Sequence, residues 1–183
     1  MASDRNRAPA SPVREALRSA TAAVHERLHV AAPFQAIAAG ALPAERYGRL
    51  LGRIHAFHSL VDPHTTRLEA LEADLEELHA LAAVPPLWER PEGAAARLGC
   101  DWVALGSAIG GKLIYRQLDY LFGSTSAGRR YFLGSPGEAK AWRALCRRLE
   151  EEGSASAPRA EMVAGARSAF ALFERCIGEP ALV

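Results

Sequence analysis

The chain has 183 residues and a formal net charge of +1, from 22 basic and 21 acidic residues. This length favours one domain with a real hydrophobic core, and the balanced charge excludes a polyanion-binding protein of the strongly basic kind. No apolar run approaches the roughly 18 residues of a membrane span, and three cysteines without a CxxC pair argue against a disulfide framework. We expect a cytoplasmic protein without nucleic-acid or membrane partners.

The two ends of the chain lack the apolar periodicity of the rest. Residues 1–11 contain charged and small residues but no apolar core, so they do not form a secretory signal. We interpret residues 1–11 as a flexible N-terminal tail and residues 179–183 as a C-terminal tail. The remaining residues, 12–178, are expected to form one helical domain.

Apolar residues three or four positions apart predict helices through the first half of the chain. The first helix is expected over residues 13–32, because the next residue is a proline, which ends a helix. A short segment over residues 34–40 follows. A second long helix is expected over residues 43–62 and a third over residues 65–82, with a leucine stripe facing inward.

The second half begins with an extended link at residues 84–87, Val-Pro-Pro-Leu. Residues 92–122 have helical spacing with a glycine interruption, either as one helix or as two. Residues 124–134 are polar and contain glycine, so they are expected to be a connection, although they include Tyr131 and Phe132.

The last part of the chain is expected to contain two further helices. Residues 135–138, Ser-Pro-Gly-Glu, have the form of a capping box, which predicts a helix that begins there and ends at Gly153. A last helix is expected to begin at Pro158 and to run to about Ile177. Because no pair of strands or internal repeat is found, the predicted fold is all-α.

Residues 106–111, Gly-Ser-Ala-Ile-Gly-Gly, place three glycines in this helical pattern. Each glycine costs about 1 kcal/mol relative to alanine in a helix. One interpretation is that a flat ligand comes close to the backbone, where a side chain would block it. The alternatives are close helix packing, or a helix that ends at Gly106 and begins again.

Residues 25–29 read His-Glu-x-x-His, the form of a zinc-peptidase motif in which two histidines share a helix face. Zinc would need a third protein ligand, and the extended motif is absent because Ala32 and Gln35 stand at its glycine and histidine positions. A second hypothesis uses His25 alone as an axial ligand to haem iron, with Arg18 two turns earlier on nearly the same face. The plain alternative is a core histidine bonded to a carbonyl group.

His55 and His58 lie three residues apart in the second long helix. A metal pair is conceivable, but we expect a partly exposed, hydrogen-bonded pair of histidines.

The segment over residues 17–28, Leu-Arg-x-x-Thr-x-x-x-His-Glu-x-Leu, resembles the proximal helix of bacterial haem oxygenases. Residues 106–111 resemble their distal helix, and the aromatic pair at 131–132 and the basic helix at 142–147 stand where that family has similar features. The resemblance covers roughly residues 13–177 and is greatest to the soluble, biliverdin-producing type associated with bacterial phytochromes.

This resemblance implies a single-domain helical bundle with haem between a proximal helix and a kinked, glycine-rich distal helix. His25 would be the iron ligand. The residues implied in catalysis at the distal wall are Gly106, Ser107, Gly110 and Gly111, and the three glycines would also contact the haem. The residues implied in holding its propionates are Arg18, Arg143 and Arg147, since carboxylates favour guanidinium partners.

Three positions depart from the family pattern. Leu105 replaces an acidic residue that many members carry before the Gly-Ser pair, and Ser107 replaces an aspartate that organises distal water in the mammalian-type motif. Ser107 can still hydrogen-bond a water. His29 stands where an acidic residue is common, which leaves a second possible iron ligand one turn from His25, and we expect only one of the two to bind.

The reaction implied is oxidative cleavage of haem at a meso carbon to biliverdin, carbon monoxide and ferrous iron, with dioxygen as co-substrate. No dinucleotide-binding motif is present, so a ferredoxin or a flavoprotein reductase would supply electrons, and a bacterial phytochrome is a conceivable receiver of the product. Two alternatives remain at this point. One is a non-catalytic haem carrier or sensor on the same fold, and the other is a similar bundle that acts on another heteroaromatic compound.

Overall fold

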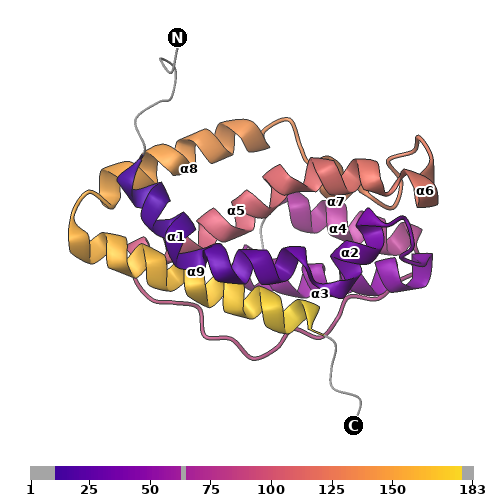
Figure 1. Ribbon diagram of the computed structural model, residues 1–183, viewed down its shortest axis with the longest axis horizontal. Helices are drawn as coiled ribbons and strands as arrows, with labels where there is room; N and C mark the ends of the chain where they lie inside the picture. The colour runs from indigo at the N-terminus through magenta and orange to yellow at the C-terminus, as the bar shows by residue number, and fades with distance from the viewer. Residues whose placement is uncertain (1–10, 63–64, 179–183) are drawn as a thin grey trace, which may run out of the picture.

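The computed structural model describes residues 11–62 and 65–178. These residues form an all-α bundle in which no strand is found (Figure 1). The helices are α1 (Pro12–His29), α2 (Ala32–Ala38), α3 (Ala44–Val61), α4 (Thr66–Glu77), α5 (Ala94–Gln117), α6 (Asp119–Phe122), α7 (Arg130–Leu133), α8 (Glu138–Glu152) and α9 (Ser156–Ile177). The all-α prediction is confirmed, while the predicted tails lie, apart from Ser11, outside the described residues.

The centre of the bundle is the pair α5 and α9, which pack along each other. Two glycines allow this close approach. A Cβ atom at Gly99 of α5 would collide with the Met162 carbonyl oxygen, and one at Gly165 of α9 would collide with the Ala96 carbonyl oxygen. The two backbones therefore touch where any other residue would hold them apart.

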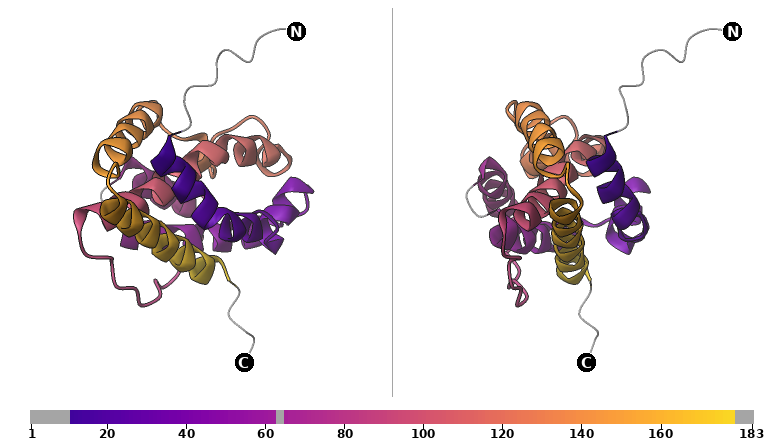
Figure 2. Two further views of the ribbon diagram at one scale, coloured as in Figure 1. Left: turned by 60° about the vertical axis from the view of Figure 1, so that its left-hand side comes forward. Right: turned by 90° about the vertical axis from the view of Figure 1, so that its left-hand side faces the viewer.

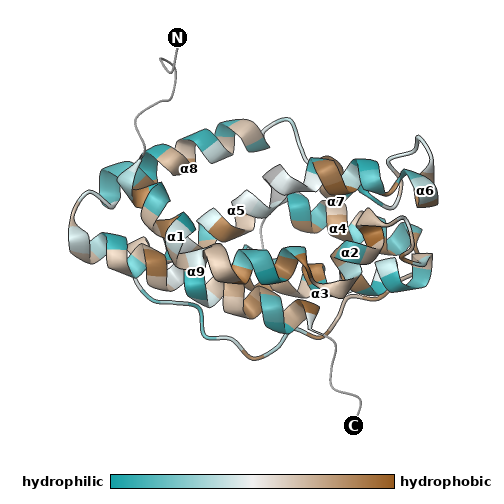
Figure 3. Cartoon of the chain, in the orientation of Figure 1, coloured by the Kyte–Doolittle hydropathy of each residue, from teal (hydrophilic) through white to brown (hydrophobic). Residues whose placement is uncertain are grey.

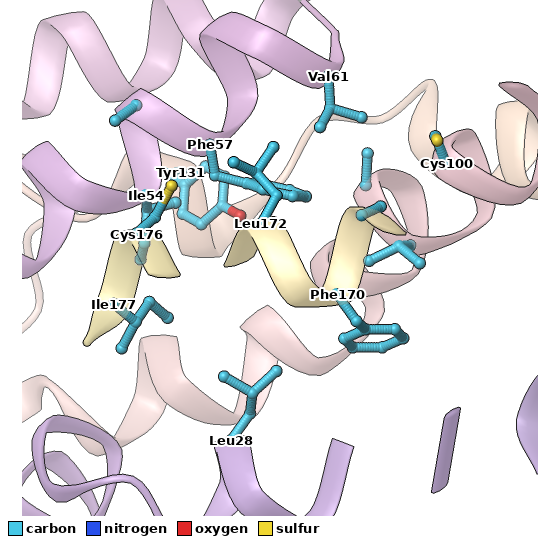
Figure 4. Packing of buried hydrophobic residues seen from close by; sticks show 14 of the residues in the cluster. Leu28, Ile54, Phe57, Val61, Cys100, Tyr131, Phe170, Leu172, Cys176 and Ile177 are labelled. Atoms are coloured by element: carbon cyan, nitrogen blue, oxygen red, sulfur yellow. The ribbon is translucent and has the colours of Figure 1, made fainter. Parts of the chain in front are cut away.

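The core forms around α9, as the close view in Figure 4 shows. Leu172 and Ile177 of α9 are buried, Leu28 of α1 faces this helix from one side, and Phe57 of α3 lies on another. Phe57 also contacts Phe173 of α9, with ring centres 4.8 Å apart. Along most helices the ribbons in Figure 3 alternate between hydrophilic and hydrophobic residues, as expected for helices with one buried face.

The arrangement of four helices positions the candidate site. α1 and α5 both pack on α9, and α8 packs on both α1 and α5. The two views in Figure 2 agree that α1 lies on one side of α9 and that α8 lies above the α5–α9 pair. α9 and α8 are thus the shared neighbours of the helices predicted to be proximal and distal.

α5 runs without a break from Ala94 to Gln117, through all three glycines. The interpretation of a helix that ends at Gly106 and begins again is therefore wrong. The ribbon of α5 changes direction along its course in Figure 1, in agreement with the predicted kink.

Three other predictions about helix bounds are corrected. The third helix ends at Glu77 and not near residue 82, because the chain turns at His79, whose φ is 50°. The connection over residues 124–134 includes the short helix α7, whose first N–H groups are held by the buried carboxylate of Asp74: Arg130 N and Tyr131 N each donate to it over 2.9 Å.

The predicted capping box is also wrong. α8 begins at Glu138 with Gly137 as its N-cap, and no side chain caps it. The Glu138 carboxylate instead accepts from Arg67 Nε of α4 at 3.0 Å. Among the described helices, none has the length and apolar character that a membrane span requires.

Candidate functional site

His25 stands near the end of α1, whose inner face is held by the buried residues Leu17, Thr21 and Leu28. The imidazole itself is exposed. It lies edge-on to the ring of Phe170 on α9, with ring centres 6.3 Å apart, and Phe170 lies 6.5 Å from the Trp102 ring of α5. A single aromatic residue of α9 thus links the predicted ligand to the predicted distal helix.

The protonation state of His25 suits a ligand role. Partial burial lowers its pKa from the ordinary value, the neighbouring His29 lowers it further, and Glu26 opposes both effects. The imidazole is therefore neutral around pH 7 and has a lone pair for a metal centre.

The glycines of α5 face two different environments. A Cβ atom at Gly110 would meet nothing within 4 Å, and this residue is exposed. One turn earlier on the same face, a Cβ at Gly106 would lie 3.5 Å from the Trp142 ring of α8. Leu113, three residues after Gly110, keeps 63% of its surface exposed. This face of α5 is therefore bounded by the Trp142 ring at Gly106 and open at Gly110, where a flat ligand could approach the backbone.

Gly111 faces the other way. It is buried, and a Cβ there would lie 3.2 Å from the Phe132 carbonyl oxygen of α7. Close helix packing therefore accounts for this glycine, while it does not account for Gly110. The two interpretations of the glycine stretch each apply to a different face of the same helix.

Behind the glycine stretch lies a chain of hydrogen bonds that starts at His58. The Nε2 atom of His58 lies 2.9 Å from the Tyr131 hydroxyl, which lies 3.5 Å from the hydroxyl of Ser107. Ser107 donates to the Ala104 carbonyl at 2.7 Å. Every donor is used if His58 Nε2–H donates to Tyr131, Tyr131 to Ser107 and Ser107 to Ala104. The Nδ1 atom of His58 is then an acceptor, and it is buried without a hydrogen-bond partner.

Arg67 of α4 fixes the start of the same stretch. This buried guanidinium donates to the carbonyl oxygens of Ala104 and, at 3.3 Å, Leu105, while its Nε pairs with Glu138. It also affects His58: burial first, then the charge of Arg67, and then His55 lower the pKa of His58 to about 3. His58 is therefore a neutral, enclosed imidazole.

The expectation of a partly exposed pair at His55 and His58 is thus half wrong. His55 is partly exposed and lies 3.7 Å from the Glu72 carboxylate, but His58 is buried and bonds to Tyr131. Sequence reasoning missed His58 and Arg67 as parts of the site. One sequence pattern pointed to His58, because it follows Ile54 by four residues and precedes Val61 by three, so it lies on the buried face of its helix.

The three predicted arginines lie exposed on the neighbouring helices α1 and α8. Arg18 of α1 lowers the pKa of the Cys146 thiol, against the larger effect of burial. Arg143 and Arg147 are four residues apart and share a face of α8, which packs on α1. Neighbouring Arg14 is paired with Glu150 at 3.4 Å, whereas Arg18 has no ion pair with any described residue.

The zinc-peptidase hypothesis gains no support. His25 and His29 do share a face, but within residues 11–62 and 65–178 no three histidine, cysteine or carboxylate side chains gather as a metal site would require. The arrangement that remains is a neutral imidazole on α1, an open glycine face on α5, and exposed arginine side chains on α1 and α8. These donors fit a flat, apolar macrocycle with a metal centre and acidic side chains.

Comparison with known proteins points the same way. The chain is 30% identical over 164 residues to a heme oxygenase of Xanthomonas campestris pv. campestris (strain 8004), over 80% of this chain and 98% of the relative. Its fold matches the NO- and CO-bound heme oxygenase from Neisseria meningitidis with a TM-score of 0.70 at 23% identity, over 93% of this chain and 94% of the other. No family model matches the chain. The identity to the Xanthomonas protein across nearly its whole length, together with this fold, shows that the chain belongs to the haem oxygenase family.

Proposed function

We propose that this chain is a haem-degrading oxygenase that cleaves haem at a meso carbon to biliverdin, carbon monoxide and ferrous iron. Haem is the substrate, and its iron supplies the activation of dioxygen. The observation that carries the proposal is the placement of a neutral, exposed imidazole on α1 and an open glycine face on α5, linked through Phe170 of α9.

His25 is the residue that binds the iron in this proposal. Its lowered pKa keeps a lone pair available near neutral pH. The buried inner face of α1 fixes the backbone that carries this imidazole. The histidine thereby fixes the substrate at one height along α1.

Gly110 leaves the opposite side of the substrate open, and Gly106 lets the Trp142 ring lie close to the helix backbone. This open face would leave room for dioxygen next to the substrate, and the backbone of α5 would limit that space on one side. The space beside Gly111 is taken up by close packing against α7. In the proposal, this glycine lets α7 approach and so brings Phe132 and Tyr131 close to α5.

In the proposal, the chain of Ser107, Tyr131 and His58 holds the Ser107 hydroxyl in place, and water at the open glycine face would carry the protons. Tyr131 is held between His58 and Ser107 by its hydroxyl group, so it positions Ser107 Oγ at the edge of the glycine face. A neutral His58 fixes the direction of the Tyr131 hydroxyl through Nε2 and does not itself give up a proton. A hydroxyl at position 107 thus takes the place of the carboxylate that the mammalian-type motif has there.

Arg18, Arg143 and Arg147 are proposed to bind the two propionate groups, because ionised carboxylates favour guanidinium partners. Electrons are proposed to come from a ferredoxin or a flavoprotein reductase. A bacterial phytochrome that receives the biliverdin, and a location in the cytoplasm, also belong to this proposal.

The test is an optical titration of the purified protein with haemin, followed by a reductant in air. A saturable one-to-one Soret band that decays into a broad bilin absorption is expected. A Soret band that survives reduction and oxygen would overturn the enzyme in favour of a carrier or sensor. A protein without any specific band would overturn haem binding altogether.

A further inference from the structure

The proposed function uses only one of two neighbouring histidines on α1, because only His25 would bind haem iron. His25 and His29 are both exposed and lie one helical turn apart, on one face. Their ring centres are 4.5 Å apart and the rings are inclined at 73°. The proposed function gives no role to His29.

The separation of the two rings matches that of a chelate. A metal–nitrogen distance of about 2.0–2.1 Å places an ion about 3.2 Å from the centre of each ring, so two imidazoles at right angles around it have centres about 4.5 Å apart. The observed ring separation is therefore the one that two imidazoles in adjacent positions of one ion require. Octahedral and tetragonal ions have such right-angled positions.

The charges around the pair also favour a cation. Glu26 follows His25 directly in the sequence, so a negative charge lies next to the pair. The nearest cation on the helix, Arg27, is paired with Glu174 of α9 at 2.8 Å. No third side-chain ligand joins the pair among the described residues, so water would fill the other positions.

We propose that the haem-free protein binds one divalent transition-metal ion through His25 and His29, and that this ion and haem exclude each other because both need His25. Nickel(II) and copper(II) fit best, since they combine high affinity for imidazole with right-angled coordination. The metal site stands independently of the proposed function, whereas the exclusion rests on it. Metal bound at the pair would hold the protein in its unloaded state.

The first experiment is a calorimetric titration of the haem-free full chain with Ni²⁺ in a non-coordinating buffer. One ion per chain is expected, and His25→Ala and His29→Ala should each weaken its binding by about tenfold or more, since each removes one of only two protein ligands. The matched control is His79→Asn, which removes a single exposed histidine and tolerates the left-handed backbone there. Binding that is as tight in His29→Ala as in the unmodified chain would overturn the site.

The second experiment is a haemin titration with and without saturating Ni²⁺. The ion should weaken haemin binding to the unmodified protein but not to His29→Ala, which cannot form the chelate. If Ni²⁺ binds at the pair and haemin affinity is unchanged, the exclusion and the assignment of His25 to haem both fail, while the metal site stands. If haemin binds through His25 and Ni²⁺ binding does not depend on the pair, the metal site fails and the proposed function stands.

Discussion

Two histidines in this protein have lowered pKa values for the same first reason, but their environments give them different chemistry. Burial is the largest cause at both His25 and His58. His25 nevertheless remains exposed at the end of α1, with a lone pair that an external metal centre can reach. His58 is enclosed in α3, where its Nε2 atom is fixed to Tyr131. The partly buried His25 is neutral and accessible to a metal centre, whereas the fully buried His58 is neutral and bonded to Tyr131.

The two faces of α5 show the same contrast over one helical turn. The face with Ser107 and Gly111 is closed by α7, which connects it to His58 through Tyr131. The face with Gly106 and Gly110 is open at its middle. The helix therefore separates a closed side, which contains a buried hydrogen-bond chain, from an open side, where the substrate fits in the proposed function.

The largest expected effect tests the open histidine. His25→Ala should lower haemin affinity by about 100-fold or more, because loss of an outer-shell partner alone usually costs 10–100-fold. Haemin titration followed by the Soret band measures the loss. His29→Ala is the matched control and should keep the affinity within a few-fold. Equal losses in the two variants would show that the iron ligand is not His25 alone.

The next effect tests the closed histidine through pH. The folded-state pKa of His58 is about 3, below its ordinary value of 6.5, so the unfolded chain binds more protons between these values. The free energy of unfolding should therefore fall as pH drops from about 6.5 towards 3, by a total on the order of 4–5 kcal/mol from this group. The contribution is complete above pH 6.5.

Urea unfolding at pH 7 and pH 5 measures this dependence, and His58→Gln is the control. The variant is less stable at both values, but the difference between the two pH values should shrink by about 2 kcal/mol, the linkage expected for 1.5 pH units. An unchanged difference would mean that His58 titrates normally in the folded protein.

Sequence reasoning succeeded where a pattern depends on local geometry. The 3.6-residue periodicity predicted α1, α3, α8 and α9 to within a few residues, because each helix buries one face. It failed at α7, since that helix depends on Asp74, which is 56 and 57 residues away in the sequence from the N–H groups it accepts from. It also failed at the start of α8, where Arg67 binds the glutamate that would have closed the capping box.

The candidate site divides along the same line. His25 and the glycine stretch could be proposed from sequence, because each is a short local motif on one helix. His58 and Arg67 could not, since their roles depend on contacts with α7 and α5 that only the fold creates. Nor could the sequence assign one glycine of the stretch to packing and another to open space.

A smaller effect is expected at the link between the two sides. Tyr131→Phe leaves His58 Nε2 buried without its partner, so it should lower the free energy of unfolding by about 1–3 kcal/mol. In the proposed function it should also slow turnover with little change in haemin affinity. Urea unfolding and single-turnover kinetics measure the two effects.

Tyr120→Phe provides the control for that variant. Tyr120 also bonds through its hydroxyl, which donates to the Leu42 carbonyl at 2.9 Å, but its side chain is 42% exposed and it is not part of the chain to Ser107. Water can replace its partner, so its loss should cost less. If the two variants unfold and turn over alike, Tyr131 has no special part in the site.

The smallest effects on stability are expected from alanine substitutions at Gly110 and Gly111. Because these glycines lie on different faces of α5, the two variants distinguish the open face from the closed one. Gly110→Ala adds a methyl group that meets nothing within 4 Å, so it should stabilise the haem-free protein by up to about 1 kcal/mol through helix propensity. Gly111→Ala gains the same propensity but forces its Cβ to within 3.2 Å of the Phe132 carbonyl oxygen, which should cancel or reverse the gain. Haemin affinity should fall in Gly110→Ala, because the methyl group enters the space that the substrate needs. Thermal unfolding without haemin and a haemin titration distinguish the pair, and a Gly110→Ala variant that binds haemin normally would remove the open face of α5 from the site.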